Sequence, residues 1–190
     1  MGRILKLVLI SVLFVALIFA ARALYNYLAV RTDVDSISIE ADPAETEETE
    51  TAPAADFTVY TYGGDEVHLS DFIGKPVVVN FWASWCPPCK QELPDFNETY
   101  LKEKDIVFMM VDLTDGSRET LETAKTFIEE MGYEFPVYYD TSGMAATLYR
   151  VASIPTTYLI DAKGNIVAYA VGMINAKSLN EGIDMIRQKG

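Results

Sequence analysis

The only two cysteines of the chain, Cys86 and Cys89, are separated by two residues. They closely follow the β-branched apolar run 77–79, which is typical of a buried strand, and Pro87 favours the first turn of a helix. Cys86 is therefore expected at a helix N-terminus, where unpaired N–H groups and the helix dipole stabilise a thiolate. This arrangement favours a redox pair in which Cys86 attacks a disulfide and Cys89, one turn later, resolves the mixed disulfide.

Two other uses of a Cys-x-x-Cys pair are less favoured by the rest of the sequence. A zinc site needs two further ligands, and His68 is the one further good candidate in the chain. A structural disulfide would close a very short loop and would stabilise the fold little, because the stabilisation grows with loop length.

The residues around the cysteines resemble the active site of the thioredoxin superfamily, in particular the membrane-anchored thiol-disulfide oxidoreductases of the TlpA/ResA type. The resemblance extends from about Asp56 to the C-terminus and rests on four segments: Phe81-Trp82-Ala83-Ser84-Trp85-Cys86-Pro87-Pro88-Cys89, Lys90-Gln91-Glu92, Leu69-Ser70-Asp71-Phe72-Ile73-Gly74-Lys75-Pro76 and Ile154-Pro155-Thr156-Thr157. It implies an α/β thioredoxin fold, in which helices flank a mixed central sheet, with an N-terminal hairpin and an extra strand-helix insertion.

The resemblance also implies a proton acceptor. Thioredoxins carry a buried acid on the strand before the active site, but the matching residue here is Asn80, which cannot accept a proton. Proteins similar to the TlpA/ResA type use a glutamate three residues after the second cysteine, which is Glu92 here. The resemblance therefore gives Glu92 the role of accepting the Cys89 proton, whereas the residues alone predict an exposed glutamate that supports the helix.

Five further residues are expected to bind substrate. Pro155 matches the cis-proline loop of the family, which implies that Ile154 pairs with the backbone of the target. Without the resemblance a trans bond is expected, since only ~5–6% of X–Pro bonds are cis. Trp85, Pro87 and Pro88 adjoin the nucleophile and are expected to form its contact surface, whereas Trp82 is expected in the core.

The two prolines also bear on the redox chemistry. Neither Pro87 nor Pro88 has an N–H group that could face the Cys86 thiolate, so the N–H of Cys89 and the helix dipole remain. We therefore expect a modestly lowered pKa for Cys86 and a couple that acts as a reductant. No cofactor and no metal are expected, because the cysteine pair is itself the redox group.

Charge divides the 190-residue chain into three parts: 1–31, 32–56 and 57–190. All acidic residues lie at or beyond Asp33, and the chain as a whole carries a net charge of −13. This charge argues against nucleic acid as a partner. Residues 33–56 hold nine acidic and no basic residues, so 32–56 is predicted to be a disordered, extended linker.

Residues 1–31 contain the apolar run 7–21, flanked by Lys6 and Arg22. One interpretation is a cleaved signal peptide, with Ala21-Arg22-Ala23 as the cleavage site. The other is an uncleaved membrane anchor, which we favour because apolar character continues beyond that site. Together with a cysteine content that suits an oxidising compartment, this predicts a single-pass membrane protein with an extracytoplasmic catalytic domain.

Within 57–190, strand-like and helix-like segments alternate after an N-terminal hairpin at 57–60 and 66–69. Buried strands are expected at 77–79 and 106–111, a further strand at 135–139, and a second hairpin at 157–160 and 166–171. The expected helices follow the cysteines, follow Ser117, run from Thr141 or Ser142 to Tyr149 and close the chain. The expected N-caps are Ser70 for a short turn that ends at Gly74, Ser117, and Asn175 or Ser178 for the last helix.

These features predict a monomeric, membrane-tethered thiol-disulfide oxidoreductase. Its expected partners are disulfide-containing exported proteins and a membrane-embedded thiol donor, and the resemblance suggests apocytochrome c as a substrate. Two alternatives of the same fold are a redox metallochaperone, which would need wider cysteine spacing and a distal histidine, and a thiol peroxidase. In peroxidases a proline and a threonine or serine usually precede the reactive thiol, whereas Ala83-Ser84-Trp85 stands here.

Overall fold

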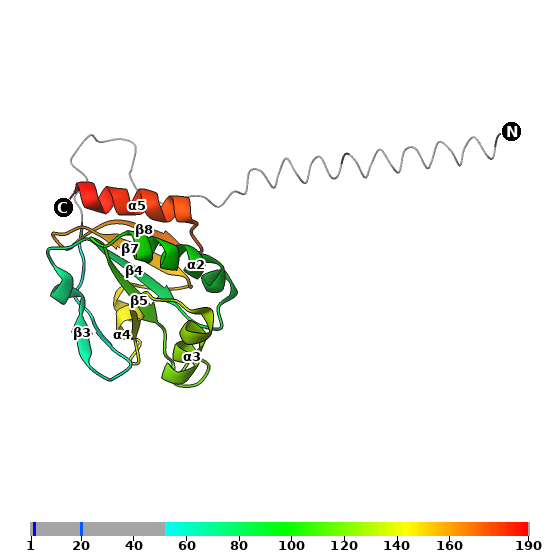
Figure 1. Cartoon of the computed structure of the whole chain (residues 1–190), viewed down its shortest axis with the longest axis horizontal. Coiled ribbons are helices and arrows are strands. Elements are labelled where there is room, and N and C mark those ends of the chain that lie inside the picture. The colour runs from blue at the N-terminus through cyan, green and yellow to red at the C-terminus, as the bar shows by residue number, and fades with distance from the viewer. Residues whose placement is uncertain (1, 3–19, 21–51, 190) are drawn as a thin grey trace. The chain divides into compact units, whose positions relative to one another are not determined.

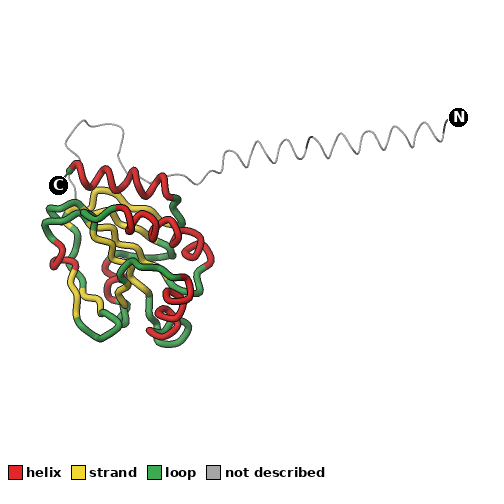
Figure 2. Tube along the Cα trace, viewed as in Figure 1, coloured by secondary structure: helices red, strands yellow, loops and turns green. Residues whose placement is uncertain are grey.

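The computed structural model describes residues 52–189 together with Gly2 and Ala20. The described chain forms an eight-stranded sheet with the strand order β1-β8-β7-β4-β5-β6-β2-β3 (Figures 1 and 2). The strands are β1 (Ala52–Pro53), β2 (Thr58–Tyr60), β3 (Glu66–His68), β4 (Val77–Trp82), β5 (Val107–Asp112), β6 (Val137–Tyr139), β7 (Thr156–Ile160) and β8 (Asn165–Val171). The helices are η2 (Leu69–Phe72), α2 (Pro87–Lys102), α3 (Leu121–Met131), α4 (Met144–Leu148) and α5 (Ala176–Gln188).

The strand that leads to the cysteines lies inside the sheet. β4 pairs parallel with β5 on one side and antiparallel with β7 on the other, which makes the sheet mixed. All six β4 residues are buried, because both faces of the sheet are covered. A continuous apolar run suits such a strand better than an alternating pattern.

Two hydrophobic cores form, one on each face of the sheet. Val78 belongs to the core with the buried faces of α2 and α5, which lie next to each other in Figure 1. Val77 and Val79 point the other way, into the core that includes residues of α4. This alternation follows from the two-residue period of a strand. The segment that carries the cysteines follows the C-terminal end of β4.

Two of the three predicted N-caps need correction. The helix expected to follow Ser117 begins at Leu121, and Thr120 is its N-cap: its hydroxyl accepts a hydrogen bond from the N–H of Thr123. Ser117 instead donates to Asp115 through its N–H and hydroxyl groups. The predicted cap was wrong because a loop and not a helix follows Ser117.

Two further corrections are small shifts along the chain. The N-cap of η2 is His68 and not Ser70. The helix predicted to start at Thr141 or Ser142 starts at Met144, after the N-cap Gly143 in left-handed conformation. For the last helix, one of the two alternatives holds. The side chain of Asn175 caps α5 by accepting from the N–H of Ser178.

The sheet begins before the predicted domain boundary. Ala52 and Pro53 pair with Ile166 and Asn165 of β8, so residues 52–56 are ordered although we predicted a disordered linker up to 56. Composition misleads here because an edge strand is held by backbone hydrogen bonds and needs few apolar side chains. The remainder of 32–56, and the segment 1–31 apart from Gly2 and Ala20, lie outside the described residues.

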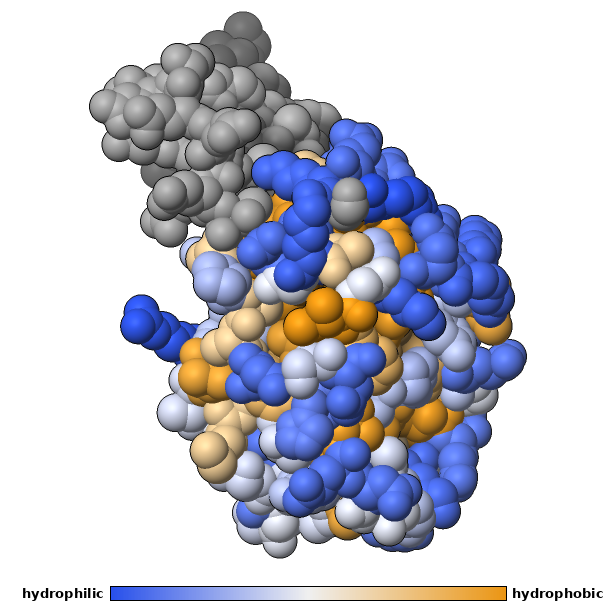
Figure 3. Space-filling view, turned by 90° about the vertical axis from the view of Figure 1, so that its left-hand side faces the viewer, coloured by the Kyte–Doolittle hydropathy of each residue, from blue (hydrophilic) through white to orange (hydrophobic). Residues whose placement is uncertain are grey.

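Within the part of the chain that the structure describes, no helix is long and apolar enough to cross a membrane. The face of the domain drawn in Figure 3 is largely hydrophilic, with smaller apolar areas between the charged side chains.

Candidate active site

Cys86 and Cys89 form a disulfide at the N-terminus of α2. A turn closed by a 3.1 Å hydrogen bond from the Cys86 N–H to the Ala83 carbonyl precedes the helix. Cys86 is the N-cap, and the Cys89 N–H donates to its Sγ at 3.2 Å. Because Pro87 and Pro88 occupy the first two helical positions, the Cys89 amide is the first N–H of α2 that can reach this sulfur.

The proline loop lies against this disulfide. The Ile154–Pro155 peptide bond is cis, as the resemblance implies, and the Ile154 carbonyl oxygen is 3.7 Å from the Cys86 sulfur. Both cysteines are buried, Cys86 with 2% and Cys89 with 0% of their surface exposed. In this oxidised form, therefore, the sulfur that we expect to react first is covered almost as fully as its partner.

Trp85 is half-buried, and one face of its indole is occupied. The guanidinium carbon of Arg118 lies 3.5 Å from the centre of the Trp85 ring, close enough for a cation–π contact. Pro87 is exposed and Pro88 half-exposed. The predicted contact surface thus includes Arg118, which sequence reasoning did not find.

Glu92 is buried on α2, one helical turn after Cys89, with 1% of its surface exposed. Its Oε1 accepts a 2.8 Å hydrogen bond from Asn80 Nδ2, and its Oε2 accepts a 3.0 Å bond from the backbone N–H of Ile174. Burial is the main influence and raises the Glu92 pKa from 4.5 to about 8, although both hydrogen bonds act in the opposite direction. The carboxyl can therefore exchange a proton near neutral pH.

Asn80, the residue in place of the thioredoxin acid, holds Glu92 in position. The same amide nitrogen that donates to Glu92 also lies 3.0 Å from Thr157 Oγ1, two residues after Pro155. Asn80 therefore links the α2 carboxyl to the start of β7, just after Pro155, a contact that we did not predict.

A pair of buried acids forms a second acidic site, beside the turn that precedes Cys86. Asp112 and Glu119 both have 0% of their surface exposed, and Glu119 Oε2 accepts from the N–H and hydroxyl of Ser84 at 3.2 and 2.9 Å. Burial is the main cause that raises the Asp112 pKa to about 8, and the nearby Glu119 adds to the increase. The hydrogen bond from Thr114 lowers this pKa, but by less. Sequence reasoning assigned nothing to Asp112 and did not consider Glu119. The position of Asp112 at the end of a buried strand was the available signal.

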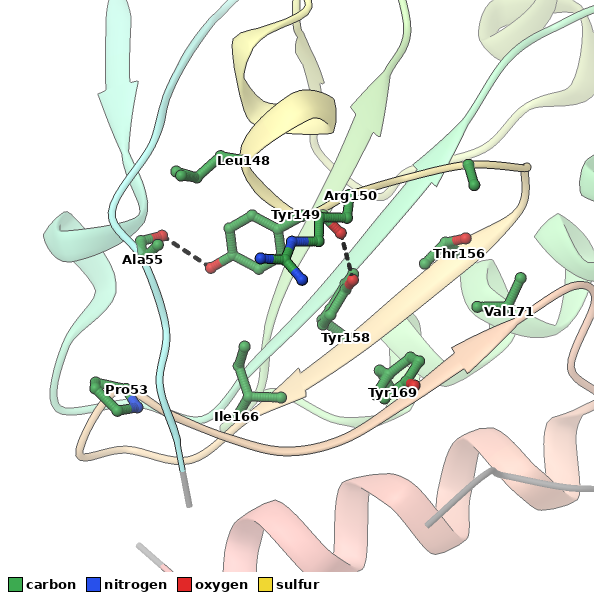
Figure 4. Close-up of a pocket in the computed structure, with 11 residues that line it drawn as sticks. Pro53, Ala55, Leu148, Tyr149, Arg150, Thr156, Tyr158, Ile166, Tyr169 and Val171 are labelled. Carbon is green, nitrogen blue, oxygen red and sulfur yellow. Dashed lines mark hydrogen bonds between the residues drawn. The ribbon is translucent and has the colours of Figure 1, made fainter. Parts of the chain in front are cut away.

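Other hollows and clusters lie away from the cysteines. A cavity of about 450 Å³ lies between α4 and strands β7 and β8, lined by Tyr149, Tyr158 and Tyr169 among others (Figure 4). None of the predicted site residues lines it. Among the described residues, no three His, Cys, Asp or Glu side chains are grouped so that they could hold a metal ion.

Comparison with known proteins agrees with this geometry. The AhpC/TSA family matches residues 51–169. The chain is 33% identical over 132 residues to the thioredoxin-like protein YneN of Bacillus subtilis, covering 70% of this chain and 77% of that protein. It is 35% identical over 135 residues to the thiol-disulfide oxidoreductase ResA of Bacillus thuringiensis, covering 70% and 76% respectively.

A solved structure is similar over the same part of the chain. The crystal structure of StoA from Bacillus subtilis superposes with a TM-score of 0.60 at 31% identity, covering 69% of this chain and 98% of that one. The predicted mixed α/β fold is thereby confirmed as the thioredoxin fold. The chain belongs to the AhpC/TSA family and, within it, is a thiol-disulfide oxidoreductase of the ResA type.

Proposed function

We propose that this protein is a membrane-tethered reductant that acts outside the cytoplasm on disulfides of exported proteins such as apocytochrome c. The observation that best supports this proposal is the combination of Cys86 at the N-terminus of α2 with a buried Glu92 one turn beyond Cys89, whose pKa burial raises to about 8. This arrangement serves both halves of a dithiol reaction, the first attack and its resolution.

In the first step, the Cys86 thiolate attacks one sulfur of the substrate disulfide. A bond forms between Cys86 Sγ and that sulfur, the substrate disulfide breaks, and the other substrate sulfur leaves as a thiolate. The Cys89 N–H, which lies 3.2 Å from Cys86 Sγ in the oxidised form, stabilises the attacking thiolate together with the helix dipole.

In the second step, Cys89 attacks Cys86 and releases the second substrate thiolate. The Cys89 thiol must lose its proton, and the Glu92 carboxylate accepts it. A carboxyl with a pKa near 8 is suited to this transfer, because a general base works best when its pKa lies near the operating pH. Two electrons have then passed to the substrate, and the Cys86–Cys89 disulfide seen in the structure is the product.

The substrate surface proposed here combines both segments beside the disulfide. Trp85, Pro87 and Pro88 surround the N-terminus of α2, while Ile154 and Pro155 lie on the adjacent loop, with the Ile154 carbonyl directed at Cys86. A polypeptide bound in extended form along Ile154 would bring its own disulfide next to Cys86. No cofactor takes part, because the cysteine pair supplies both electrons.

The proline pair supports the direction of the reaction. With no N–H at residues 87 and 88, the Cys86 thiolate receives less stabilisation than it would from a helix with all its first amides. A less stabilised thiolate form makes the dithiol a better electron donor. A membrane-embedded thiol donor would then return the pair to the reduced form, with residues 1–31 keeping the protein at the membrane.

Trapping of partners in cells tests this proposal. The full-length chain with Cys89→Ser can attack substrates but cannot resolve the mixed disulfide, so it should accumulate covalent complexes with exported, cysteine-containing proteins. The double variant Cys86→Ser with Cys89→Ser is the control and should trap nothing. Complexes formed mainly with cytoplasmic proteins would contradict the proposed location, and a Cys89→Ser chain that traps nothing would contradict the proposed activity.

A further inference from the structure

The turn that carries Cys86 contains Ser84, whose N–H and hydroxyl donate to the same acceptor atom. In the turn closed between Ala83 and Cys86, the N–H of Ser84 is not used by the turn hydrogen bond. This N–H and the Ser84 hydroxyl both donate to Glu119 Oε2, at 3.2 and 2.9 Å. A fully buried carboxylate thus anchors a residue two positions before the reactive cysteine.

The segment that carries Glu119 is itself held rigidly. Asp115 Oδ1 accepts hydrogen bonds from the backbone N–H groups of Ser117, Arg118 and Glu119, at 2.7, 2.7 and 3.0 Å. The Gly116 N–H donates to the Glu119 carbonyl at 2.9 Å, which closes the segment on itself. Arg118 and Glu119 therefore contact the turn from a segment that its own hydrogen bonds hold in place.

Arg118 and Glu119 hold neighbouring residues of the turn. Arg118 stacks on Trp85 with 3.5 Å between the guanidinium carbon and the ring centre, while Glu119 bonds Ser84. We call the segment 115–119 the turn clamp. It belongs to the extra strand-helix region between β5 and α3, so this region contributes directly to the active site.

Asp112 is a second buried acid near Glu119. It ends β5 directly opposite Trp82, the last residue of β4, and it is fully buried. Burial is the largest cause of its raised pKa of about 8, and the nearby Glu119 adds to the increase. Asp112 Oδ2 has no hydrogen-bond partner among the described residues, so the neutral acid is the favoured form of Asp112.

The two acids differ in the donors that reach them. Thr114 donates to Asp112 Oδ1 at 2.6 Å, Asp115 adds a further negative charge near Asp112, and Tyr139 of β6 stays neutral because burial, the main cause, and nearby acids raise its pKa to about 12. Glu119 accepts the two Ser84 bonds and, at 3.5 Å, one from Thr123, so the donors of the turn converge on Glu119.

We propose that Glu119 is a positioning residue for Cys86: it binds both donors of Ser84 and so holds the turn that presents the nucleophile, while the protonated Asp112 nearby adds no charge of its own. The inference rests on the proposed function, since it concerns the first attack of that reaction. It predicts that loss of the Glu119 bonds slows Cys86 without any change at the cysteines themselves.

The test measures the rate at which reduced Cys86 attacks dithiodipyridine, in full-length chains that all carry Cys89→Ser. Glu119→Ala should slow this attack about tenfold, the effect of losing two hydrogen bonds that fix a reacting group. Glu119→Gln should stay close to the parent, because its amide oxygen can accept both Ser84 bonds and its NH₂ can donate to Asp112. Glu130→Gln, an exposed position on α3, is the matched control.

The pH profile separates positioning from simple support of the fold. Above the Asp112 pKa of about 8, Asp112 gains a negative charge near Glu119 that disturbs the Ser84 bonds, so the parent rate should fall below the value that the thiolate fraction alone predicts. Asp112→Asn keeps a hydrogen-bond donor but cannot titrate. In this variant the rate of attack at alkaline pH should follow the thiolate fraction of Cys86.

Two results would overturn the inference: a Glu119→Ala rate equal to the parent, or the same alkaline deviation in Asp112→Asn. If Glu119→Ala does not fold, Ser84→Ala, which removes one of the two bonds, replaces it and should give a smaller decrease in the same direction. A parent chain that attacks dithiodipyridine but reduces no protein disulfide would instead contradict the proposed function and leave the positioning role standing.

Discussion

Two buried acid sites flank the cysteines, and their surroundings differ. Glu92 is a single carboxyl that faces two donors, the amide of Asn80 and the backbone N–H of Ile174. Asp112 and Glu119 face each other, and the donors of Ser84 bind only one of them. Burial raises the pKa to about 8 at Glu92 and at Asp112, so the pKa values alone would suggest the same role.

The difference in partners separates the two roles. The Glu92 carboxyl lies on the cysteine helix one turn after Cys89, where the proposed mechanism moves a proton in each catalytic cycle. Glu119 accepts hydrogen bonds from the N–H and hydroxyl of Ser84, and in our proposal it holds the turn. We conclude that a raised pKa marks a buried carboxyl, and that its neighbours decide whether it transfers a proton or fixes a loop.

The largest expected effect is on resolution of the mixed disulfide. Glu92→Gln keeps the shape of the side chain but cannot accept a proton, so resolution should slow about a hundredfold, the usual contribution of general base catalysis. Glu119→Gln should leave this step within about threefold of the parent, because loss of a base is not involved. Stopped-flow reduction of a disulfide across pH measures both.

The same experiment includes its own check. The plot of resolution rate against pH for Glu92→Gln should lack one inflection that the parent and Glu119→Gln both show. Superimposable profiles for all three chains would leave Glu92 as a structural residue, with water accepting the Cys89 proton.

A smaller effect concerns the dependence of stability on pH. Glu92 and Asp112 have ordinary pKa values of 4.5 and 3.8 and folded values of about 8. Between these values the unfolded chain loses the proton that the folded chain keeps, so stability is highest at low pH and falls as pH rises to 8. Each group should contribute about 1.4 kcal/mol per pH unit to this decrease.

Denaturant unfolding of the oxidised protein between pH 5 and 8 measures this slope. Glu92→Gln and Asp112→Asn should each remove the part of the slope that comes from one proton. The double variant should remove both parts, because the two sites share no partner. Glu130→Gln should not change the slope. An Asp112→Asn chain with the parent's slope would show that Asp112 does not retain a proton in the folded protein.

The smallest effect is expected at the exposed part of the turn clamp. Arg118→Ala removes the cation–π contact with Trp85 and should lower the free energy of unfolding by about 0.5–1 kcal/mol, the range for such contacts near the surface. Arg118→Lys should recover part of this loss. A loss well above that range would mean that Arg118, and not Glu119, is the main support of the turn.

Much of the fold followed from local sequence patterns. The apolar run at 77–79 and Pro87 correctly placed a buried strand and a helix on either side of the cysteines, because both signals act within a few residues. The start of the sheet at Ala52 was missed because β1 depends on backbone pairing with β8, more than a hundred residues later in the chain.

The site shows the same limit. Glu92 was found because a family pattern fixes its distance from Cys89, and its burial could then be anticipated. Glu119 could not be found in this way, because its partner Ser84 is 35 residues away and meets it only after β5 and the turn clamp have folded. Asp112 could have been suspected, since the ends of neighbouring parallel strands meet at one edge of a sheet.

The assignment of the two cysteines is tested most directly by single serine variants of the full-length chain, mixed with a disulfide-containing peptide and analysed by mass spectrometry. We predict that Cys89→Ser accumulates a peptide adduct on Cys86, whereas Cys86→Ser forms none at neutral pH. A stable adduct on Cys89 in the Cys86→Ser chain, with no adduct on Cys86 in the Cys89→Ser chain, would contradict the proposed mechanism.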